Sequence, residues 1–293
     1  MKKRNLEGKV ALVAGATRGA GRAIAIELGK AGAIVYVTGR SVRGNSSEMN
    51  RKETIEETAE LIEAAGGKAI WVQVDHTKPE EVKTLISKIK KEQGKLDILI
   101  NDIWGGDPFV VWSQKFWEHS LENGLKVQKT CLDSHLITNY FAAPLMIETG
   151  SGLVIEITDG IDNRYRGNLY YSLIKSSIIN LASYLSEELK PHGISVIAVT
   201  PGFLRSEAML DHFGVEEKNW KDAVLEEPHF IASETPAYVG RAVAALAQDP
   251  DVFSKTGTVT SSWRLSEEYD FVDLDGNRPH WGRYFKEKFG EDI

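Results

Sequence analysis

Two side chains able to move a proton stand four residues apart, in the segment Tyr171-Ser172-Leu173-Ile174-Lys175. On a helix, this spacing places the phenol and the ammonium on one face, one turn apart. A neighbouring cation favours the phenolate and lowers the pKa of a tyrosine from its ordinary value of about 10. The pair therefore predicts a general acid/base, Tyr171, for the interconversion of a carbonyl and an alcohol.

A glycine-rich turn separates the first apolar run from the first helical pattern, with the sequence Gly15-Ala16-Thr17-Arg18-Gly19-Ala20-Gly21. Glycines there permit a tight turn and a close approach of the backbone, and the N-terminus of the following helix accepts a pyrophosphate. A plain strand-to-helix turn is the alternative. The strand before it and the helix after it favour a dinucleotide site.

The end of the second predicted strand carries an arginine instead of an acid. The segment Val37-Thr38-Gly39-Arg40-Ser41 lacks the carboxylate that usually binds a free ribose 2′-hydroxyl. Arg18 and Arg40 offer two guanidinium groups, whose planar shape suits a 2′-phosphate. These residues favour NADP(H) over NAD(H) as the cofactor, and the alternative is that both arginines face solvent.

The overall composition is that of a globular protein with one large core. A chain of 293 residues suits one α/β domain, and its net charge of −7 argues against nucleic acid or an anionic membrane as a partner. No apolar stretch is long enough to span a membrane, and the N-terminus does not resemble a signal peptide. Cys131 is the single cysteine, so we expect a buried thiol and a cytoplasmic protein. The histidines lack metal-ligand spacing.

Strand-like and helix-like patterns alternate along the chain. Continuous apolar runs separated by helices are typical of a parallel sheet buried on both faces, and right-handed crossovers make it a doubly wound, three-layer α/β fold (Rossmann fold). We expect a single domain over residues 1–265, with a substrate loop around 203–232 and a C-terminal tail over 266–293. The predicted strands are 10–14, 33–38, 69–74, 96–100, 153–158 and 194–200, and the predicted helices are 20–30, 53–65, 80–92, 116–148 and 170–190.

These motifs occur in the order found in a known family. Over about residues 6–262 the chain resembles the classical short-chain dehydrogenase/reductases. Its glycine turn is similar to their Thr-Gly-x-x-x-Gly-x-Gly, and Tyr171 and Lys175 match their catalytic pair. Asn101 begins a segment that resembles Asn-Asn-Ala-Gly, and the segment from Pro201 to Ser206 resembles Pro-Gly-x-x-x-Thr.

The resemblance implies further roles. Lys175 would bind the nicotinamide ribose, and Pro201, Gly202 and Ser206 would lie beside the nicotinamide. Asp75 and His76 are similar to the third-strand segment that contacts adenine, and Asn101 is expected at the cofactor too. The substrate would be a small carbonyl or alcohol. Because the family pairs its long fourth and fifth helices between subunits, a homodimer or homotetramer is expected.

Within the family, the chain resembles the branch that contains dehydrogenase/reductase member 1. The shared features are Phe116-Trp117, Gly202-Phe203 leading into Met209-Leu210, and Asp273-Leu274-Asp275-Gly276. This branch implies no particular substrate.

Two positions depart from the family pattern. Asp159 stands where the family has its catalytic serine, and Thr158 precedes it. An ionised carboxylate cannot donate to a carbonyl oxygen and raises the pKa of a nearby phenol, whereas a protonated one can donate. Two roles therefore remain open for Asp159: it faces the substrate, or it caps a turn with Gly160. Thr158 could supply a hydroxyl in place of the serine. Gly124 occupies the place of the asparagine used in the family's proton relay.

Aromatic residues mark the expected substrate region and the tail. Trp104 and Phe203 are candidate substrate contacts, with packing beneath loops as the alternative. Trp281, Phe285 and Phe289 recur at helical spacing and predict docking onto the same subunit or a partner. The favoured function is an NADP(H)-dependent oxidoreductase. The alternatives are a non-catalytic NADP(H)-binding protein and a dehydratase or epimerase of the same fold.

Overall fold

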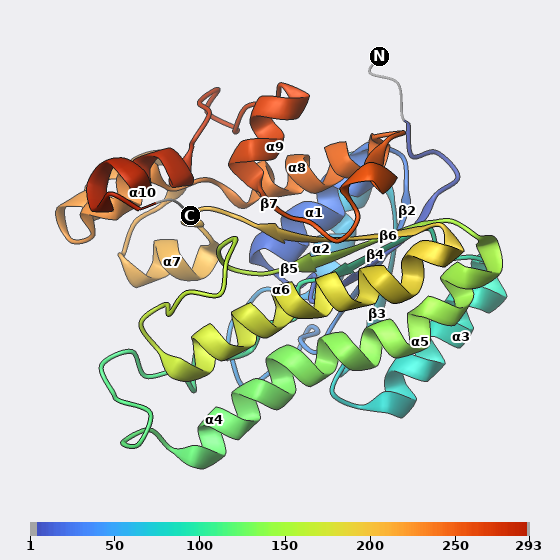
Figure 1. Ribbon diagram of the computed structural model, residues 1–293, viewed down its shortest axis with the longest axis horizontal. Coiled ribbons are helices and arrows are strands. Elements are labelled where there is room, and N and C mark those ends of the chain that lie inside the picture. Colours follow the sequence, from blue (N-terminus) through green and yellow to red (C-terminus); the bar gives the residue numbers. More distant parts are fainter. Residues whose placement is uncertain (1–4, 292–293) are drawn as a thin grey trace.

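Seven parallel strands form one sheet in the order β3-β2-β1-β4-β5-β6-β7, in a computed structural model that describes residues 5–291 (Figure 1). The strand order reverses between β1 and β4, which confirms the predicted doubly wound fold. The sequence patterns predicted six of the strands, and β7 is an additional short one. The strands are β1 (Val10–Ala14), β2 (Ile34–Gly39), β3 (Lys68–Gln73), β4 (Ile98–Asn101), β5 (Gly152–Ile157), β6 (Ile194–Thr200) and β7 (Val259–Ser261).

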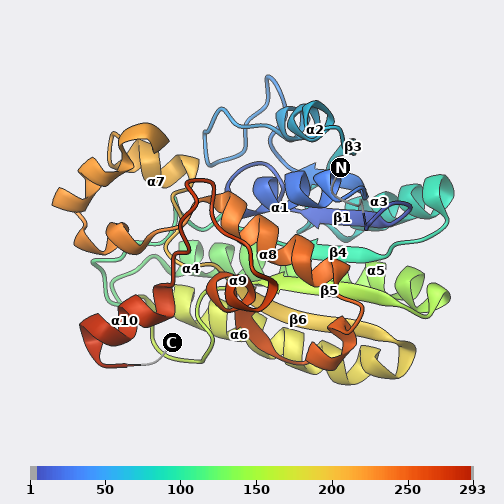
Figure 2. The same cartoon turned by 90° about the horizontal axis from the view of Figure 1, so that it is seen from above.

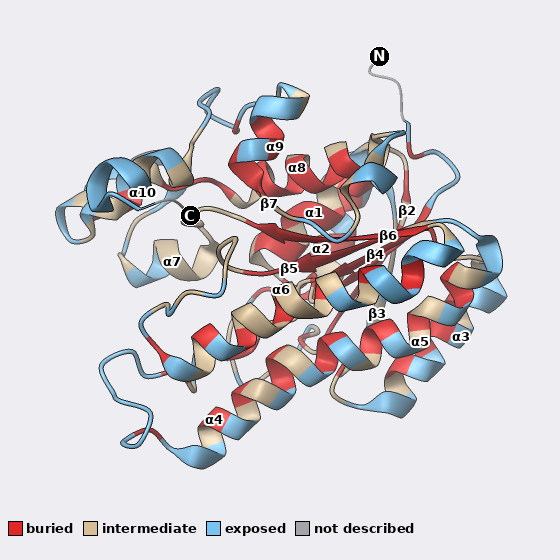
Figure 3. Ribbon diagram, in the orientation of Figure 1, coloured by how far each residue is buried: buried red, intermediate tan, exposed pale blue. Residues whose placement is uncertain are grey.

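Helices cover both faces of this sheet (Figures 2 and 3). Apolar side chains from both faces of the strands fill the space between the sheet and the helices. One face packs against α1 (Gly19–Lys30), α2 (Ile55–Ala64), α8 (Pro236–Gln248) and α9 (Ser262–Tyr269). The other packs against α3 (Pro79–Gln93), α5 (Ser134–Thr149) and α6 (Leu169–Leu189). Strands buried on both sides must be apolar at nearly every position, which explains the continuous runs in the sequence.

A side-chain cap sets the residue at which α6 begins, and so the direction in which Tyr171 and Lys175 point from the helix. The Asn168 side chain accepts a hydrogen bond from the backbone N–H of Tyr171, as helix N-caps do. Within the helix, Tyr171 and Lys175 are one turn apart, as predicted. The sequence thus fixes the position of the pair by a local signal and by packing of the buried α6 face on the sheet.

The predicted helix over residues 116–148 is shorter and interrupted in the structure. It begins only at α4 (Leu121–Gln128), because the Ser120 side chain caps it by accepting from the backbone N–H of Asn123. A π-helical segment (Lys129–Asp133) joins α4 to α5.

The chain after β6 forms the expected substrate loop and the tail. The short helices in the expected substrate loop are α7 (Glu207–His212), η3 (Glu217–Leu225) and η4 (Pro228–Ala232); η2 (Lys190–His192) and η5 (Val252–Lys255) lie elsewhere. Residue 266, the expected start of the tail, lies inside α9. The tail ends in α10 (Trp281–Phe289), which packs beside η4. Among residues 5–291, no helix has the length and apolar content needed to cross a bilayer.

Candidate active site

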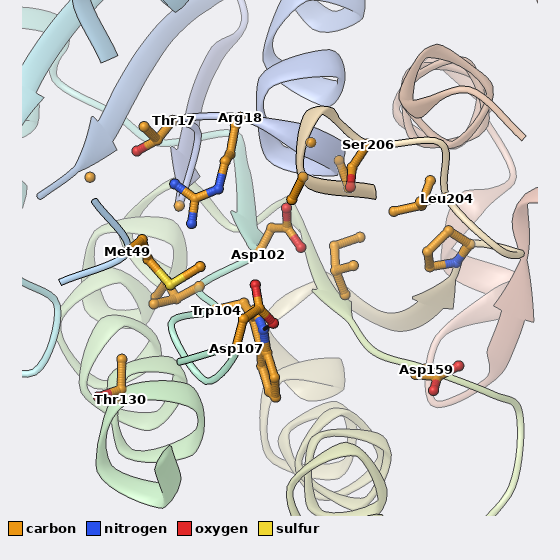
Figure 4. A pocket seen from close by; sticks show the side chains of 18 of the residues that line it. Thr17, Arg18, Met49, Asp102, Trp104, Asp107, Thr130, Asp159, Leu204 and Ser206 are labelled. Carbon is orange, nitrogen blue, oxygen red and sulfur yellow. Dashed lines mark hydrogen bonds between the residues drawn. The ribbon is translucent and has the colours of Figure 1, made fainter. Parts of the chain in front are cut away.

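A cavity of about 890 Å³ opens at the carboxyl end of the sheet, beside the paired strands β1 and β4, between which the strand order reverses. Ligands bind at this position in doubly wound folds. Figure 4 shows Arg18 and Thr17 of the glycine turn on one side of the cavity, Asp159 on the opposite side, and Trp104 and Asp107 between them. The predicted site residues that line it are Gly15, Thr17, Arg18, Gly19, Ala20, Arg40, Ser41, Asp75, His76, Trp104, Thr158, Asp159, Tyr171, Lys175, Pro201, Gly202, Phe203 and Ser206.

The glycine turn is shaped by close backbone contacts. A Cβ on Gly15, whose φ is +90°, would lie 2.3 Å from the carbonyl oxygen of Asp102, and a Cβ on Gly21 would lie 2.4 Å from that of Gly15. Gly21 therefore supports the turn without lining the cavity. The Gly19 N–H, at the start of α1, donates to a carboxylate oxygen of Glu207 at 2.9 Å. This contact shows that the helix N-terminus accepts an anionic oxygen, as a bound pyrophosphate requires.

The two arginines expected at the 2′-phosphate reach the same cavity. Burial lowers the pKa of Arg18 from its usual value, so this guanidinium gains from an anionic ligand. Arg40 pairs with Glu48 at 2.7 Å, and Glu48 also lies 3.5 Å from Lys126. The loop after β2 thus supplies a carboxylate that the end of the strand itself lacks, a feature that sequence spacing did not reveal.

Asp75 and His76, the residues expected at the adenine, both line the cavity but in different ways. The Asp75 carboxylate accepts from the backbone N–H and the hydroxyl of Thr77, at 3.0 and 2.7 Å. The His76 ring lies between the hydroxyls of Thr38 and Thr138, at 2.9 and 2.8 Å, and burial lowers the pKa of His76 to about 3. His76 is therefore neutral and holds the end of β2 against α5.

Asn101 is not brought into the cavity. Its side-chain amide donates to Glu156 at 2.7 Å in the buried layer below, and it is fully buried. Because successive strand residues point to opposite sides, the next residue, Asp102, faces the cavity instead. Burial raises the pKa of Asp102 to about 6, against the opposing charge of Lys175.

Tyr171, the expected general acid/base, has an unusual partner. The Tyr171 hydroxyl donates to Oδ2 of Asp159 at 2.9 Å. The Gly160 N–H donates to Thr200, so Asp159 does not cap the turn with that group. The Thr158 hydroxyl donates to the backbone carbonyl of Lys175 at 2.8 Å and thereby joins β5 to α6. Of the two candidates for the serine's place, only Asp159 contacts the phenol.

The electrostatic environment of Tyr171 differs from the one expected from Lys175 alone. Burial, followed by the charge and the hydrogen bond of Asp159, raises the pKa of Tyr171 well above its ordinary value, and Arg166 opposes this only in part. The Lys175 ammonium lies 5.7 Å from the Tyr171 ring and 4.6 Å from the Trp104 ring. In this arrangement the phenol keeps its proton at neutral pH.

Gly124, at the place of the relay asparagine, makes room for an aromatic ring. A Cβ on this glycine would lie 2.2 Å from Cζ of Tyr170. The Tyr170 ring in turn lies 5.0 Å from the His119 ring, centroid to centroid. The glycine is therefore explained by the packing of α4 against the start of α6.

Two aromatic rings pack against the Tyr171 phenol. The rings of Trp104 and Trp112 lie 5.4 and 5.0 Å from that of Tyr171, centroid to centroid. Across the cavity, Phe203 contacts Trp281 at 5.9 Å. Trp281 begins α10, so the tail docks onto its own chain and supplies a cavity wall.

A buried polar cluster beneath the cavity was not foreseen. The Glu156 carboxylate in β5 accepts from Asn101 and from Asn139 at 2.6 Å, and it contacts His135 Nδ1, also at 2.6 Å. The other nitrogen of His135 lies 3.2 Å from the carbonyl of Ile103, next to Trp104. A glutamate inside the apolar run Val154-Ile155-Glu156-Ile157 was the available signal, because a buried carboxylate requires partners.

The fold, the glycine turn and the Tyr171–Lys175 pair are those of a nicotinamide-dependent dehydrogenase, and the chain belongs to the short-chain dehydrogenase family, whose model matches residues 9–213. It is 32% identical over 276 residues to dehydrogenase/reductase SDR family member 1 of Mus musculus, covering 92% of this chain and 85% of that protein, and the Homo sapiens protein matches equally. These matches confirm the resemblance to that branch.

More distant relatives support the same assignment. A 3-oxoacyl-[acyl-carrier-protein] reductase, FabG, of Staphylococcus epidermidis is 28% identical over 244 residues, covering 82% of this chain and 92% of the relative. A solved short-chain dehydrogenase of Mycobacterium thermoresistibile superposes with a TM-score of 0.78 at 21% identity, covering 94% of this chain and 92% of the other. The latter similarity concerns the fold.

Proposed function

We propose that this protein is an NADP(H)-dependent oxidoreductase that interconverts a carbonyl and an alcohol, with Tyr171 as the general acid/base. The main observation in support is that the glycine turn, Lys175 and Tyr171 line one continuous cavity. The anion-accepting N–H of Gly19 and the guanidinium groups of Arg18 and Arg40 fit a phosphorylated dinucleotide.

In the reduction of a carbonyl, Tyr171, Lys175 and the tryptophans of the cavity would each have a separate role. A bound dinucleotide supplies the hydride that adds to the carbonyl carbon. Tyr171 gives its hydroxyl proton to the carbonyl oxygen as the C=O π bond breaks, and the resulting phenolate is re-protonated from solvent. Lys175 binds the nicotinamide ribose and adds positive charge beside the phenolate. Trp104, Trp112 and Trp281 exclude water from the reacting atoms.

A carbonyl panel followed by NADPH absorbance at 340 nm, with Tyr171→Phe as the matched variant, tests this function. The phenylalanine keeps the ring and its packing on Trp104 but has no proton to give. We expect turnover to fall about 10²- to 10⁴-fold while NADPH affinity stays within about twofold. Equal turnover by the variant would refute the role of Tyr171. Tight NADPH binding without turnover of any carbonyl or alcohol would instead favour a dinucleotide-binding protein.

We also propose that the protein works as a homodimer or homotetramer in the cytoplasm. Large apolar side chains are exposed on α4, α5 and α6, at Leu125, Leu136, Tyr140, Leu173 and Tyr184. An exposed apolar surface of this kind supports an interface between subunits. The single cysteine, Cys131, is buried, which is compatible with a reducing compartment. Light scattering after size exclusion measures the oligomeric state directly.

A further inference from the structure

Charge is unevenly distributed between the two ends of the cavity. The lining cations Arg18, Arg40 and Lys175 belong to the part proposed for the dinucleotide, together with the carboxyl groups of Asp75 and Asp102. Beyond Tyr171, the lining combines aromatic rings and aliphatic side chains such as Leu204 with the carboxylate of Asp159, with Asp107 between the two parts (Figure 4) and the exposed His212 on α7. The part left for the substrate is thus largely apolar and carries negative charge.

Asp159 is placed to receive a ligand. Within residues 5–291 its side chain accepts one hydrogen bond, from the Tyr171 hydroxyl, and it is 44% exposed and lines the cavity. Arg166 Nε forms an ion pair with Asp159 Oδ2 at 3.8 Å, which offsets part of the negative charge but is too long for a hydrogen bond. The terminal nitrogens of Arg166 donate instead to the backbone carbonyls of Arg164 and Asp162. The carboxylate therefore retains acceptor capacity beside the reacting hydroxyl.

The aromatic walls accept cations on their faces. The Lys175 ammonium lies 4.6 Å from the centre of the Trp104 ring, within the range of a cation–π interaction. The Trp104 ring is thus occupied by Lys175, whereas Trp112, which also packs against the Tyr171 ring, is more than half exposed and lines the cavity. An indole and a carboxylate that both contact the same phenol are groups of the kind that recognise organic ammonium ions.

We propose that the substrate is a cationic carbonyl or alcohol, with an ammonium group one or two carbons from the reacting carbon, held by Asp159 and the indole of Trp112. The short distance follows from the 2.9 Å between the Tyr171 hydroxyl and the Asp159 carboxylate. This inference rests on the proposed function and names its substrate class. In reduction, the carbon gains hydride from NADPH, the oxygen gains the Tyr171 proton, and the ammonium group is unchanged.

A cationic substrate also resolves the electrostatic conflict at the catalytic phenol. The negative charge of Asp159 stabilises the protonated phenol and opposes the phenolate that forms when the proton leaves. A bound ammonium neutralises that charge at the moment of proton transfer. The substrate then supplies the favourable field that a serine hydroxyl would otherwise provide at this position.

A pair of isosteric ketones tests the inference during turnover. In (2-oxopropyl)trimethylammonium and 4,4-dimethylpentan-2-one, a trimethylammonium group and a tert-butyl group occupy the same volume. We expect kcat/KM with NADPH to be about tenfold or more higher for the cation. Asp159→Asn should bring the ratio of the two values close to one, whereas Asp133→Asn, an exposed carboxylate change on the π-helical segment, should leave it unchanged. An equal or higher kcat/KM for the neutral ketone overturns the inference.

Binding without turnover separates this inference from the proposed function. Tetramethylammonium chloride is titrated into the protein while tryptophan fluorescence is recorded, with sodium chloride at equal ionic strength as the control. We expect saturable quenching that is lost in Asp159→Asn and reduced in Trp112→Phe. Quenching without reduction of either ketone would refute the oxidoreductase and keep the cation site. Reduction of neutral ketones without quenching would keep the oxidoreductase and refute the cation site.

Discussion

The Tyr171 hydroxyl donates to the Asp159 carboxylate at 2.9 Å, so a negative charge lies at the position where the sequence motif led us to expect a neutral serine hydroxyl. A carboxylate next to a phenol stabilises the protonated phenol. The site is therefore biased toward Tyr171 as a proton donor, which is the role needed for carbonyl reduction. The opposite role, removing a proton from an alcohol, requires the phenolate and is disfavoured by the same contact.

Asp159→Asn should shift the pH dependence of both reaction directions. Removing the charge lowers the pKa of Tyr171 from its raised value. Reduction requires the protonated phenol, so its alkaline limb should move to lower pH. Alcohol oxidation requires the phenolate, so its rate should increase at pH values below that limb. Profiles of kcat/KM against pH for a neutral substrate measure both effects, and coincident profiles for the variant and the parent would contradict the electrostatic role of Asp159.

Arg40→Ala should weaken the preference for NADPH over NADH. A charge-assisted hydrogen bond to a phosphate contributes about 1.5–3 kcal/mol, which corresponds to a loss of about tenfold or more in NADPH affinity. NADH lacks the 2′-phosphate, so its affinity should change little. Melting temperatures of the parent and the variant with each dinucleotide give the comparison.

Arg43→Ala is the matched control for that experiment. Arg43 lies in the same loop, but it pairs with the exposed Glu60 and does not line the cavity. Its removal should leave both dinucleotides unaffected. A parent protein that is stabilised equally by NADPH and NADH would remove the basis for assigning the phosphate to Arg18 and Arg40.

The parts of the site that depend on local backbone geometry could be read from the sequence. Helical periodicity places Tyr171 and Lys175 one turn apart on the same face. The glycine turn is recognisable because it lies between a strand and a helix. The contribution of Trp281 depends on how the tail folds back over more than 70 residues from Phe203, which no local pattern encodes. The same holds for Glu48, which reaches Arg40 through an irregular loop.

Side-chain direction was the other source of error. Asn101 was expected at the cofactor because of its place in a motif, but its amide is required to satisfy the buried Glu156. A one-residue step along a strand reverses the direction of the side chain, so Asp102 lines the cavity. The lowering of the Tyr171 pKa expected from Lys175 is likewise outweighed, because burial and the carboxylate of Asp159 raise this pKa.

Glu207→Gln should tighten dinucleotide binding. The Glu207 carboxylate accepts from the Gly19 N–H at 2.9 Å, at the helix N-terminus proposed for the pyrophosphate. It therefore competes with the ligand and adds negative charge beside it. Glutamine keeps the shape without the charge, and we expect the Kd for NADPH to fall about two- to fivefold.

Titration calorimetry measures this change, and Glu57→Gln provides the comparison. Glu57 also pairs with the α1 residue Arg22, at 2.6 Å, but it contacts no amide of the glycine turn. Its neutralisation should leave the Kd within error of the parent value. Weaker NADPH binding in Glu207→Gln would show that this carboxylate supports the loaded site instead of competing with it.

Gly124→Asn, which restores the residue of the family's proton relay, should destabilise the protein. A Cβ at this position would lie 2.2 Å from the Tyr170 ring, so the ring or helix α4 must move. Overpacking of this kind costs about 1–3 kcal/mol, which thermal unfolding would report as a lower Tm. Gly150→Asn is the control, because the space around Gly150 is open and its φ of +67° is one that asparagine tolerates.

The double variant Gly124→Asn/Tyr170→Ala separates packing from every other role of the glycine. Removing the ring vacates the space that the asparagine needs, so the cost of Gly124→Asn should be smaller in the Tyr170→Ala background than in the parent. A coupling free energy of about 0.5–3 kcal/mol is the expected size for residues in direct contact. Strictly additive losses would mean that Gly124 is required for a backbone conformation and not for the Tyr170 ring.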